Sequence, residues 1–542
     1  MYFPTLRASF ASHRPIDSGR VSQMLKSSGA MAGATMTSRL LGVAREIAYA
    51  SFMGNHWVAS AFQLAFAVPN LFRRLLGEGA LTAAFIPIFK QKEVKEGEKE
   101  MWRSANAVIS GLVTATAVIT IVAVLGISVA LAVWPFPQET KLMLLLLRIM
   151  FPYMPLVCLA AVLIGMANAR GHFFVPALGA ALLNVVMILS VLFLAPRMGA
   201  TLPDQIRGLA IGVVLAGLAQ AFFQLPSLQR EGYGYQWVSP WRDPTVRQVF
   251  RKMLPGSIGV AAFQINVLVI SFASFWFENT IVATFNYSVR LMEFPQGLFG
   301  ISLATYLLPT LSGLAAEKKI GEFRQTLSQG LTYLSFTNLL AAAMALALSE
   351  PIVRLIFERG KFGPDATHRV AIALACLAPG LLMFSMNNIL ARAFFALNDI
   401  KTPMKISILC LGLNLIFALW LVQPYREAGL AVANTLSATF NTLLLLYALR
   451  RKLSRVGMTQ IVKTLLVLLP SALAAGLVAA GLAWLWDKQL GHKSFPVKLG
   501  AVFIPGSAGV LVYWVLSTFG GVTAAKEITT LLLRIKDRLR PT

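Results

Sequence analysis

The sequence contains few charged residues, and acidic residues are especially scarce. Charged residues make up 13% of the 542 residues, about half of their usual share in soluble domains. Asp and Glu number 23 against 48 Lys and Arg, which gives a formal net charge of +25. In contrast, 57% of the residues are apolar, more than a soluble globule of this size can bury. The composition excludes a soluble enzyme and a disordered chain, and it predicts an all-α polytopic membrane protein.

Residue types that bind metals or form disulfides are also rare. The three cysteines, Cys158, Cys376 and Cys410, stand alone in apolar runs, and the five histidines are scattered. No pair has the spacing of a metal site or a redox motif, so we expect no metal, no cofactor and no catalytic residue. The basic residues form no stripe with interleaved aromatics, so we expect no nucleic-acid partner.

The first 28 residues are basic but contain no apolar segment of the kind found in secretory signal peptides. We therefore expect residues 1–28 to be a cytoplasmic N-terminal tail. Met24, followed directly by Leu25 and Lys26, is a second candidate for the first residue of the protein.

Long apolar runs follow one another along the rest of the chain. Each is long enough to cross a bilayer as a helix, and we count fourteen: 29–53, 57–89, 104–134, 142–168, 174–196, 206–226, 249–276, 280–309, 327–350, 367–397, 402–423, 428–449, 460–486 and 497–518. With the N-terminus inside, cytoplasmic segments carry about three times as many Lys and Arg as outer ones. This bias predicts cytoplasmic N- and C-termini.

Three pairs of landmarks indicate an internal repeat with an offset of about 220–230 residues. They are Pro69 with Pro295, the stretch 168–171 before Pro176 with 397–400 before Pro403, and 208–210 with 429–431. The repeat predicts two parallel six-helix halves, an N lobe (29–226) and a C lobe (249–449), plus two extra helices (460–518) and a basic cytoplasmic tail (519–542). Such repeats are typical of transporters, with the substrate path between the halves.

Most of the charged residues inside the predicted spans lie in three of them, 29–53, 57–89 and 280–309. A charge at membrane depth is costly, so it normally faces a cavity or a partner. Three acids lie within the spans: Glu46, Glu78 and Glu293. Five arginines lie in the same spans: Arg39, Arg45, Arg73, Arg74 and Arg290. Arg74 with Glu78 and Arg290 with Glu293 have the spacing of helical ion pairs. Even with all three acids paired, the interior stays net positive.

Guanidinium groups bind phosphate through two parallel hydrogen bonds and stay charged at any working pH. The cluster therefore indicates a cavity for a phosphate- or pyrophosphate-bearing substrate; the alternative is ion pairs that only hold helices together, or arginines that reach to the interface. Three arginines lie nearer to span ends: Arg148, Arg369 and Arg392. For these we expect packing contacts or side chains that reach to the interface. Pro69 and Pro295 interrupt their helices at matching places, which predicts kinks that are either static or part of a gate.

Several motifs resemble one transporter family. They are Ser38-Arg39-Leu40-Leu41-Gly42-Val43-Ala44-Arg45, Pro69-Asn70-Leu71-Phe72-Arg73-Arg74, Glu78-Gly79-Ala80 with Phe85-Ile86-Pro87, Arg290-Leu291-Met292-Glu293-Phe294-Pro295, Gly360-Lys361-Phe362 and Asp399-Ile400-Lys401-Thr402-Pro403. From about residue 24 onward the chain resembles the MurJ (MviN) lipid II flippases of the multidrug/oligosaccharidyl-lipid/polysaccharide exporter superfamily.

The resemblance implies a fourteen-helix fold that exports lipid II, the lipid-linked peptidoglycan precursor, across the bacterial cytoplasmic (inner) membrane by alternating access. It implies that the five arginines line a central cavity and hold the pyrophosphate, and that the helices over 460–518 form a groove for the lipid tail. The chain departs from the family at Ser60 and Val289, where many members carry an acid. Both departures make the cavity more positive.

Two other functions remain open at this stage. An exporter of another undecaprenyl-pyrophosphate-linked saccharide would share the fold and the arginines. A membrane-embedded glycosyltransferase would need a catalytic acid or base, which the arginine-paired acids do not supply, so we expect a non-enzyme. We expect a monomer among membrane lipids. No ligand set for a coupling ion is evident.

Overall fold

The structure is a computed structural model that describes residues 18–77, 80–453, 458–527 and 529–530. All regular elements in these residues are helical, and they contain no strand. Nine of the described helices are long and apolar enough to cross a membrane, and the number rises to eleven when two bent helix pairs are each counted as one span. This confirms the all-helical, multi-pass class. Fewer helices have this length and apolar character than the fourteen predicted spans.

The described residues of the first half form eight α-helices and three short segments of other helix types. They are α1 (Ser18–Met53), α2 (Trp57–Phe72), the π-helix η1 (Arg73–Gly77), α3 (Ala80–Glu96), α4 (Glu98–Val133), α5 (Gln138–Met150), α6 (Tyr153–Ala169), α7 (Phe174–Leu189), the π-helix η2 (Ser190–Leu194), the 3-10 helix η3 (Ala195–Met198) and α8 (Leu202–Arg230).

The second half has a similar order of elements. They are α9 (Pro244–Phe277), α10 (Ile281–Pro295), the π-helix η4 (Gln296–Ile301), α11 (Ser302–Ala316), α12 (Ile320–Ala347), α13 (Ser349–Phe357), α14 (Pro364–Leu377), α15 (Gly380–Ala396), α16 (Lys401–Leu453), α17 (Met458–Leu490) and α18 (Phe495–Phe519).

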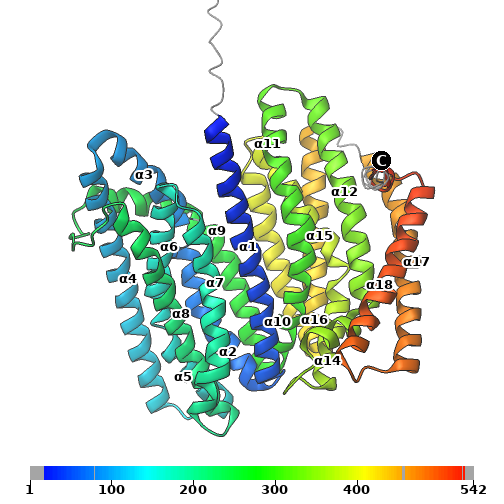
Figure 1. Cartoon of the computed structure of the whole chain (residues 1–542), viewed down its shortest axis with the longest axis horizontal. Coiled ribbons are helices and arrows are strands. Elements are labelled where there is room, and N and C mark those ends of the chain that lie inside the picture. The colour runs from blue at the N-terminus through cyan, green and yellow to red at the C-terminus, as the bar shows by residue number, and fades with distance from the viewer. Residues whose placement is uncertain (1–17, 78–79, 454–457, 528, 531–542) are drawn as a thin grey trace, which may run out of the picture.

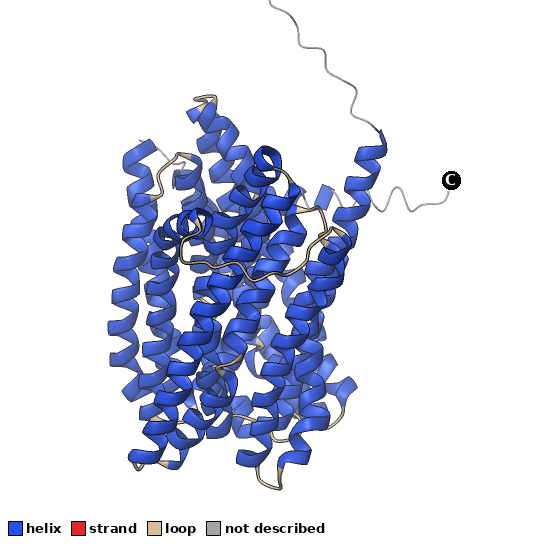
Figure 2. Cartoon of the chain, turned by 90° about the vertical axis from the view of Figure 1, so that its left-hand side faces the viewer, coloured by secondary structure: helices blue, strands red, loops and turns tan. Residues whose placement is uncertain are grey.

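The helices form two groups that stand side by side. Figure 1 shows α3 to α8 on one side and α11 to α18 on the other, with α1 between them and α17 and α18 at the outer edge. Figure 2 shows that most helices run roughly parallel to one another. The helix α1 begins, and α18 ends, at the same end of the molecule (Figure 1).

Proline and the breaks next to it shape several of the long helices. Two helix pairs bend at short breaks: α5 to α6 by 42° and α14 to α15 by 47°. The breaks contain Pro152 and Pro379, and proline cannot donate a hydrogen bond to the preceding turn. In α16, Arg426 has φ 51° and ψ −129°, so this element is two helices joined just after Pro424.

The two prolines expected to kink their helices are both followed by π-helical turns. Pro69 lies inside α2, four residues before η1, and Pro295 is the last residue of α10, directly before η4. A π-helical turn widens the helix and is frequent at functional sites. In both halves, therefore, the α-helix changes to a π-helix within four residues of the proline.

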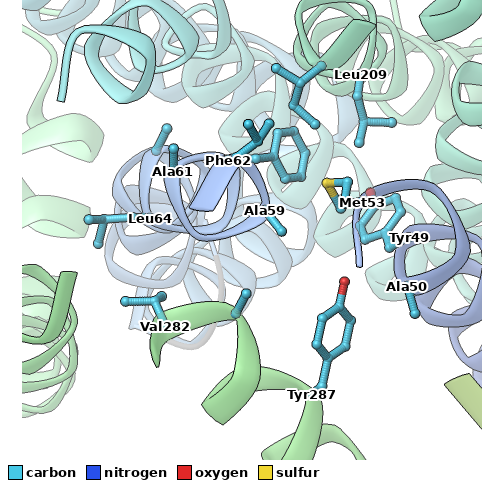
Figure 3. Packing of buried hydrophobic residues seen from close by; sticks show 14 of the residues in the cluster. Tyr49, Ala50, Met53, Ala59, Ala61, Phe62, Leu64, Leu209, Val282 and Tyr287 are labelled. Carbon is cyan, nitrogen blue, oxygen red and sulfur yellow. The ribbon is translucent and has the colours of Figure 1, made fainter. Parts of the chain in front are cut away.

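Large apolar side chains cover the outside of the molecule. On α4, Val118, Leu125 and Val129 are each at least 55% exposed. In a soluble protein such a surface would drive aggregation, but in a bilayer it faces lipid tails. Inside, a cluster of buried residues joins the two halves: Figure 3 shows Tyr287 of α10 pointing toward Tyr49 and Met53 of α1, with Phe62 of α2 nearby.

Candidate functional site

A cavity of about 170 Å³ lies between the two halves of the chain, enclosed mainly by α1, α2, α9 and α10. We call it the arginine cavity. Its charged lining residues are Arg45, Glu46, Arg74 and Arg290. Its polar neutral lining includes Gln63, Asn70, Gln264 and Asn286. The cavity therefore combines three guanidinium groups with one carboxylate.

Glu46 connects the two halves electrostatically at this cavity. Its carboxylate forms an ion pair with the adjacent Arg45, and its Oε1 lies 3.6 Å from Nε of Arg290 on α10. Nη1 of Arg290 also lies 2.7 Å from Oε2 of Glu293, the pair predicted from their spacing. Among the described residues, the guanidinium groups of Arg45, Arg74 and Arg290 thus lie at one site with the carboxylates of Glu46 and Glu293.

The other predicted site residues lie elsewhere. Arg39 is exposed and does not line the arginine cavity; its Nη1 lies close to η4, 3.7 Å from where a Cβ at Gly297 would be. Arg73 also lies outside the lining, and its Nε donates a hydrogen bond of 2.7 Å to Oδ1 of Asn70. Glu78 lies outside the described residues. The structure thus brings three of the five predicted arginines together around one space.

The arginines expected to have structural roles do make structural contacts. Arg369 of α14 forms ion pairs of 2.7 Å with Glu278 and with Glu427. Arg392 donates a hydrogen bond of 2.8 Å to Oγ1 of Thr305. The sequence could not identify the partners of Arg369, because both acids lie just beyond the ends of predicted spans and far away along the chain.

Ser60 and Val289, the two positions at which the family resemblance implies an acid, both lie where the halves meet. Oγ of Ser60, fully buried, accepts a hydrogen bond of 3.0 Å from the backbone N–H of Ala283 in α10. Val289 packs against the apolar cluster that joins the halves. A carboxylate at either position would be placed among apolar neighbours, so here neutral side chains suit the packing.

Backbone contacts join the halves where α1 ends. The N–H of Lys361 donates a hydrogen bond of 2.9 Å to the carbonyl of Ser51, and the hydroxyl of Tyr287 donates one of 3.2 Å to the carbonyl of Gly54. Nδ2 of Asn286 donates a hydrogen bond of 2.8 Å to Oε1 of Gln63. We call the backbone contacts of Ser51 and Gly54 the outer closure, after the side of the membrane on which the sequence predicts this end to lie. They hold the halves together beside the arginine cavity.

A helical multi-pass fold with a cationic cavity between two halves defines the protein as a membrane transporter. Residues 49–500 match the profile of the family described as lipid II flippase MurJ, and the chain belongs to this family. It is 32% identical to the probable lipid II flippase MurJ of Vibrio cholerae serotype O1, over 95% of this chain and 97% of that protein. It is 34% identical to the lipid II flippase MurJ of Burkholderia cenocepacia, over 78% of this chain and 83% of that protein.

Solved structures show the same fold. A structure titled lipid II flippase MurJ, inward closed conformation, superposes with a TM-score of 0.74 at 22% identity, covering 90% of this chain and 98% of that one. An inward-facing multidrug resistance MATE family transporter of the MOP superfamily gives a TM-score of 0.62 at 13% identity, covering 79% of this chain and 99% of that one. At these identities the likeness concerns the fold alone.

Proposed function

We propose that the protein is a lipid II flippase that carries its substrate from the inner to the outer leaflet of the bacterial cytoplasmic membrane. The observation that carries this proposal is the arginine cavity, in which Arg45, Arg74 and Arg290 converge from both halves of a chain that belongs to the MurJ family. A doubly charged linker between a lipid and a sugar needs such a set of cations to leave water.

The arginine cavity is suited to hold a pyrophosphate. Arg290 is 48% exposed in its side chain, and its contact to Glu46 is long at 3.6 Å. A phosphate oxygen can therefore approach this guanidinium without first breaking a short hydrogen bond to Glu46. Arg45 and Arg74 add charge from α1 and η1, whereas Arg39 is placed to meet the anion along α1, near η4. We propose that the substrate passes Arg39 and settles between Arg45, Arg74 and Arg290.

Transport would proceed by alternating access of two halves, an N lobe (29–226) and a C lobe (249–449). The fourteen-span arrangement with a parallel repeat is supported by the two bent pairs, which begin at Gln138 and Pro364, about 226 residues apart. It is also supported by the kink at Arg426, which divides α16 into two helices. In this arrangement both termini lie in the cytoplasm.

The two helices after the C lobe would hold the lipid tail. The helices α17 and α18 expose large apolar side chains such as Leu473, Leu477 and Phe503, which are each at least 59% exposed. A surface of this kind suits a long hydrocarbon chain that stays in the bilayer while the head group crosses. The basic tail 519–542, of which residues 528 and 531–542 lie outside the described residues, is proposed to be cytoplasmic.

The test replaces Arg290 in cells that depend on this flippase. Arg290→Ala should abolish complementation at an unchanged protein level, and Arg290→Lys should restore it only in part because an ammonium cannot reproduce the paired hydrogen bonds of a guanidinium. Arg392→Ala, which removes an arginine outside the cavity, is the matched control. Full complementation by Arg290→Ala would contradict the proposed role of the cavity.

A further inference from the structure

A second and larger cavity, of about 490 Å³, lies within the second half of the chain between α9, α10, α15 and α16. None of its lining residues is charged, but six are asparagines and four are serines. We call it the amide cavity. The asparagines are Asn266, Asn286, Asn387, Asn414, Asn434 and Asn441. A surface that only packs helices together is normally apolar, because every buried carboxamide must be hydrogen-bonded. Six carboxamides around one space are therefore unexpected for simple helix packing.

The amide cavity is continuous with the arginine cavity. Four residues line both spaces: Val267 and Ser271 of α9, and Val282 and Asn286 of α10. A ligand whose anionic part lies at Arg290 can therefore extend along α9 and α10 into the amide cavity. Charge recognition and neutral polar recognition are thus separated into two adjoining compartments.

Several of these amides retain unused hydrogen-bonding capacity. Asn266 donates through Nδ2 to the carbonyl of Leu411 at 2.9 Å, and Asn414 donates through Nδ2 to Asn434 at 3.2 Å. These bonds orient each amide and leave its Oδ1 without a donor from the described residues. Oδ1 of Asn441 is buried and has no hydrogen-bond partner among them. A buried polar atom such as Oδ1 of Asn441 normally has a partner, so it points to a ligand or water that supplies a donor.

We propose that the amide cavity binds the uncharged sugar portion of a pyrophosphate-linked saccharide, through its hydroxyl and acetamido groups. This inference rests on the function proposed above, since it assigns the part of the substrate next to the pyrophosphate. A sugar bonded directly to a pyrophosphate must lie next to the arginines that hold this pyrophosphate. The amide cavity is the space that adjoins these arginines. Carboxamide oxygens accept hydrogen bonds from the hydroxyl and acetamido N–H groups of a sugar. Carboxamide N–H groups donate hydrogen bonds to the oxygens of the sugar.

The size and polarity of the cavity fit this ligand class. Its volume lies within the range of about 300–1,000 Å³ found for ligand pockets. A hydrocarbon tail would leave the amides unpaired, which is unfavourable. The absence of charge among the lining residues leaves anion recognition to the arginine cavity.

The experiment measures equilibrium binding of two lipids to the full-length protein in nanodiscs. One is lipid II, and the other is undecaprenyl pyrophosphate, which has the anion and the tail but no sugar. Asn266→Leu and Asn414→Leu keep a similar side-chain shape and remove the amide. Each should weaken lipid II binding about tenfold, the worth of one or two neutral hydrogen bonds, and leave undecaprenyl pyrophosphate binding unchanged.

Two controls make the outcomes distinguishable. Asn388→Leu removes an amide from α15 that donates to its own helix at Phe384 and lies outside the cavity lining, so it should change neither affinity. Arg290→Ala should weaken both lipids. If the Asn266 and Asn414 variants bind both lipids as wild type does, or lose both equally, the sugar site is wrong while the flippase function stands. If wild type binds neither lipid, the proposed function itself fails.

Discussion

Glu46 shows how one side chain can link the two halves without sealing the cavity. It contacts Arg45 on its own helix and, at 3.6 Å, Arg290 on α10. The longer contact is weaker than a direct hydrogen bond, so an incoming phosphate can replace it. Because a pyrophosphate brings more negative charge than a single carboxylate, the exchange favours the substrate. We therefore propose that substrate binding at Arg290 and release of its contact with Glu46 between the halves occur together.

Asp399 is another residue with a defined electrostatic role, at the start of α16. Its carboxylate accepts hydrogen bonds from the backbone N–H of Thr402 at 3.0 Å and from Nζ of Lys452 at 2.8 Å. The hydrogen bond from Lys452, and then the one from Thr402, lower the pKa of Asp399 to about 2. The residue thus caps the first turn of α16 and ties it to the far end of the same element.

Replacing Asp399 should therefore reduce stability in a pH-dependent way. Asp399→Ala should cost about 1 kcal/mol at neutral pH through the lost cap. The folded-state pKa is depressed below the value of about 3.9 of an unfolded chain, so the charge-dependent stabilisation is present above pH 4 and disappears as the pH falls toward 2. Thermal unfolding of the purified protein across this range measures the difference between the variant and wild type.

Asp365 provides a matched control for this prediction. It lies in the first turn of α14, is exposed, and makes no hydrogen bond or ion pair with the described residues. Asp365→Ala should leave the unfolding temperature nearly unchanged at every pH. A gap between wild type and Asp399→Ala that stays constant from pH 7 to 2 would show that the carboxylate charge has no role.

At the scale of helices and loops, the outer closure depends on two glycines that approach backbone of the opposite half. Gly54, at φ 62°, follows α1, and a Cβ there would lie 2.5 Å from the carbonyl oxygen of Lys361. Gly360, at φ 59°, would place a Cβ 2.4 Å from the carbonyl oxygen of Ser51. Neither backbone can yield easily, since the N–H of Lys361 is bonded to Ser51. The closure therefore requires glycine on both sides.

A methyl group at Gly54 should weaken the outer closure and shift the protein toward a state open at that end. Spin labels at His56 and Asp365, in the turns of opposite halves, should report a longer distance in Gly54→Ala than in wild type. Gly97→Ala is the matched control, because Gly97 also has positive φ, 85°, but nothing lies within 4 Å of its Cβ position. Gly97→Ala should therefore keep the wild-type distance distribution, and a wild-type distribution in Gly54→Ala would show that the closure does not depend on this glycine.

Interlocked ion pairs also bind the elements of the first half to one another. Arg170, at the end of α6, pairs with Glu93 of α3, Glu98 of α4 and Glu231 after α8. Hydrogen bonds from His172, and then from Arg170, lower the pKa of Glu231. Four helix ends are thus tied through one guanidinium, which helps this half to move as one body.

At the scale of the whole molecule, the arrangement predicts which loops face outward. With both termini in the cytoplasm, as we propose, we expect residues 351–366, which include Gly360 and Lys361, on the outer side. A cysteine introduced at Pro364, in a variant without the three native cysteines, should react with a membrane-impermeant reagent added from outside. Reaction only after the cytoplasmic side is exposed would reverse the topology.

The charge of the cavity predicts what drives closure around the substrate. With five arginines and three acids in the spans around it, we expect the empty cavity to carry excess positive charge. Bringing the halves together on it would then cost energy, because the charges would approach in a low dielectric. A pyrophosphate balances these charges, so a ligand that binds the closed state better shifts the population toward it. We expect the substrate, more than a bound cation, to trigger the transition from inward to outward.

Distances between labels on the two halves measure this transition. Adding lipid II to the reconstituted protein should change the distance distribution clearly, whereas undecaprenol, which lacks the pyrophosphate, should leave it unchanged. An equal change with sodium alone, or none with lipid II, would show that the charge of the substrate is not the trigger.

The amino-acid sequence by itself determined the class of the molecule and the chemistry of its interior. Long apolar runs with few charges permit only a helical multi-pass fold, because lipid offers no partner to the backbone. The local spacing was also sufficient for the pair Arg290–Glu293. This pair depends on residues within one helical turn, which the sequence displays directly.

Only the tertiary structure decided which charges share one space. Arg45, Arg74 and Arg290 line the cavity while Arg39 and Arg73 do not, because the rotation and tilt of each helix depend on its packing against others. The contact from Glu46 to Arg290 and the amide cavity join residues from distant parts of the chain. Asparagines scattered through apolar runs carry no local signal of a site, and they become one only where four helices bring them together.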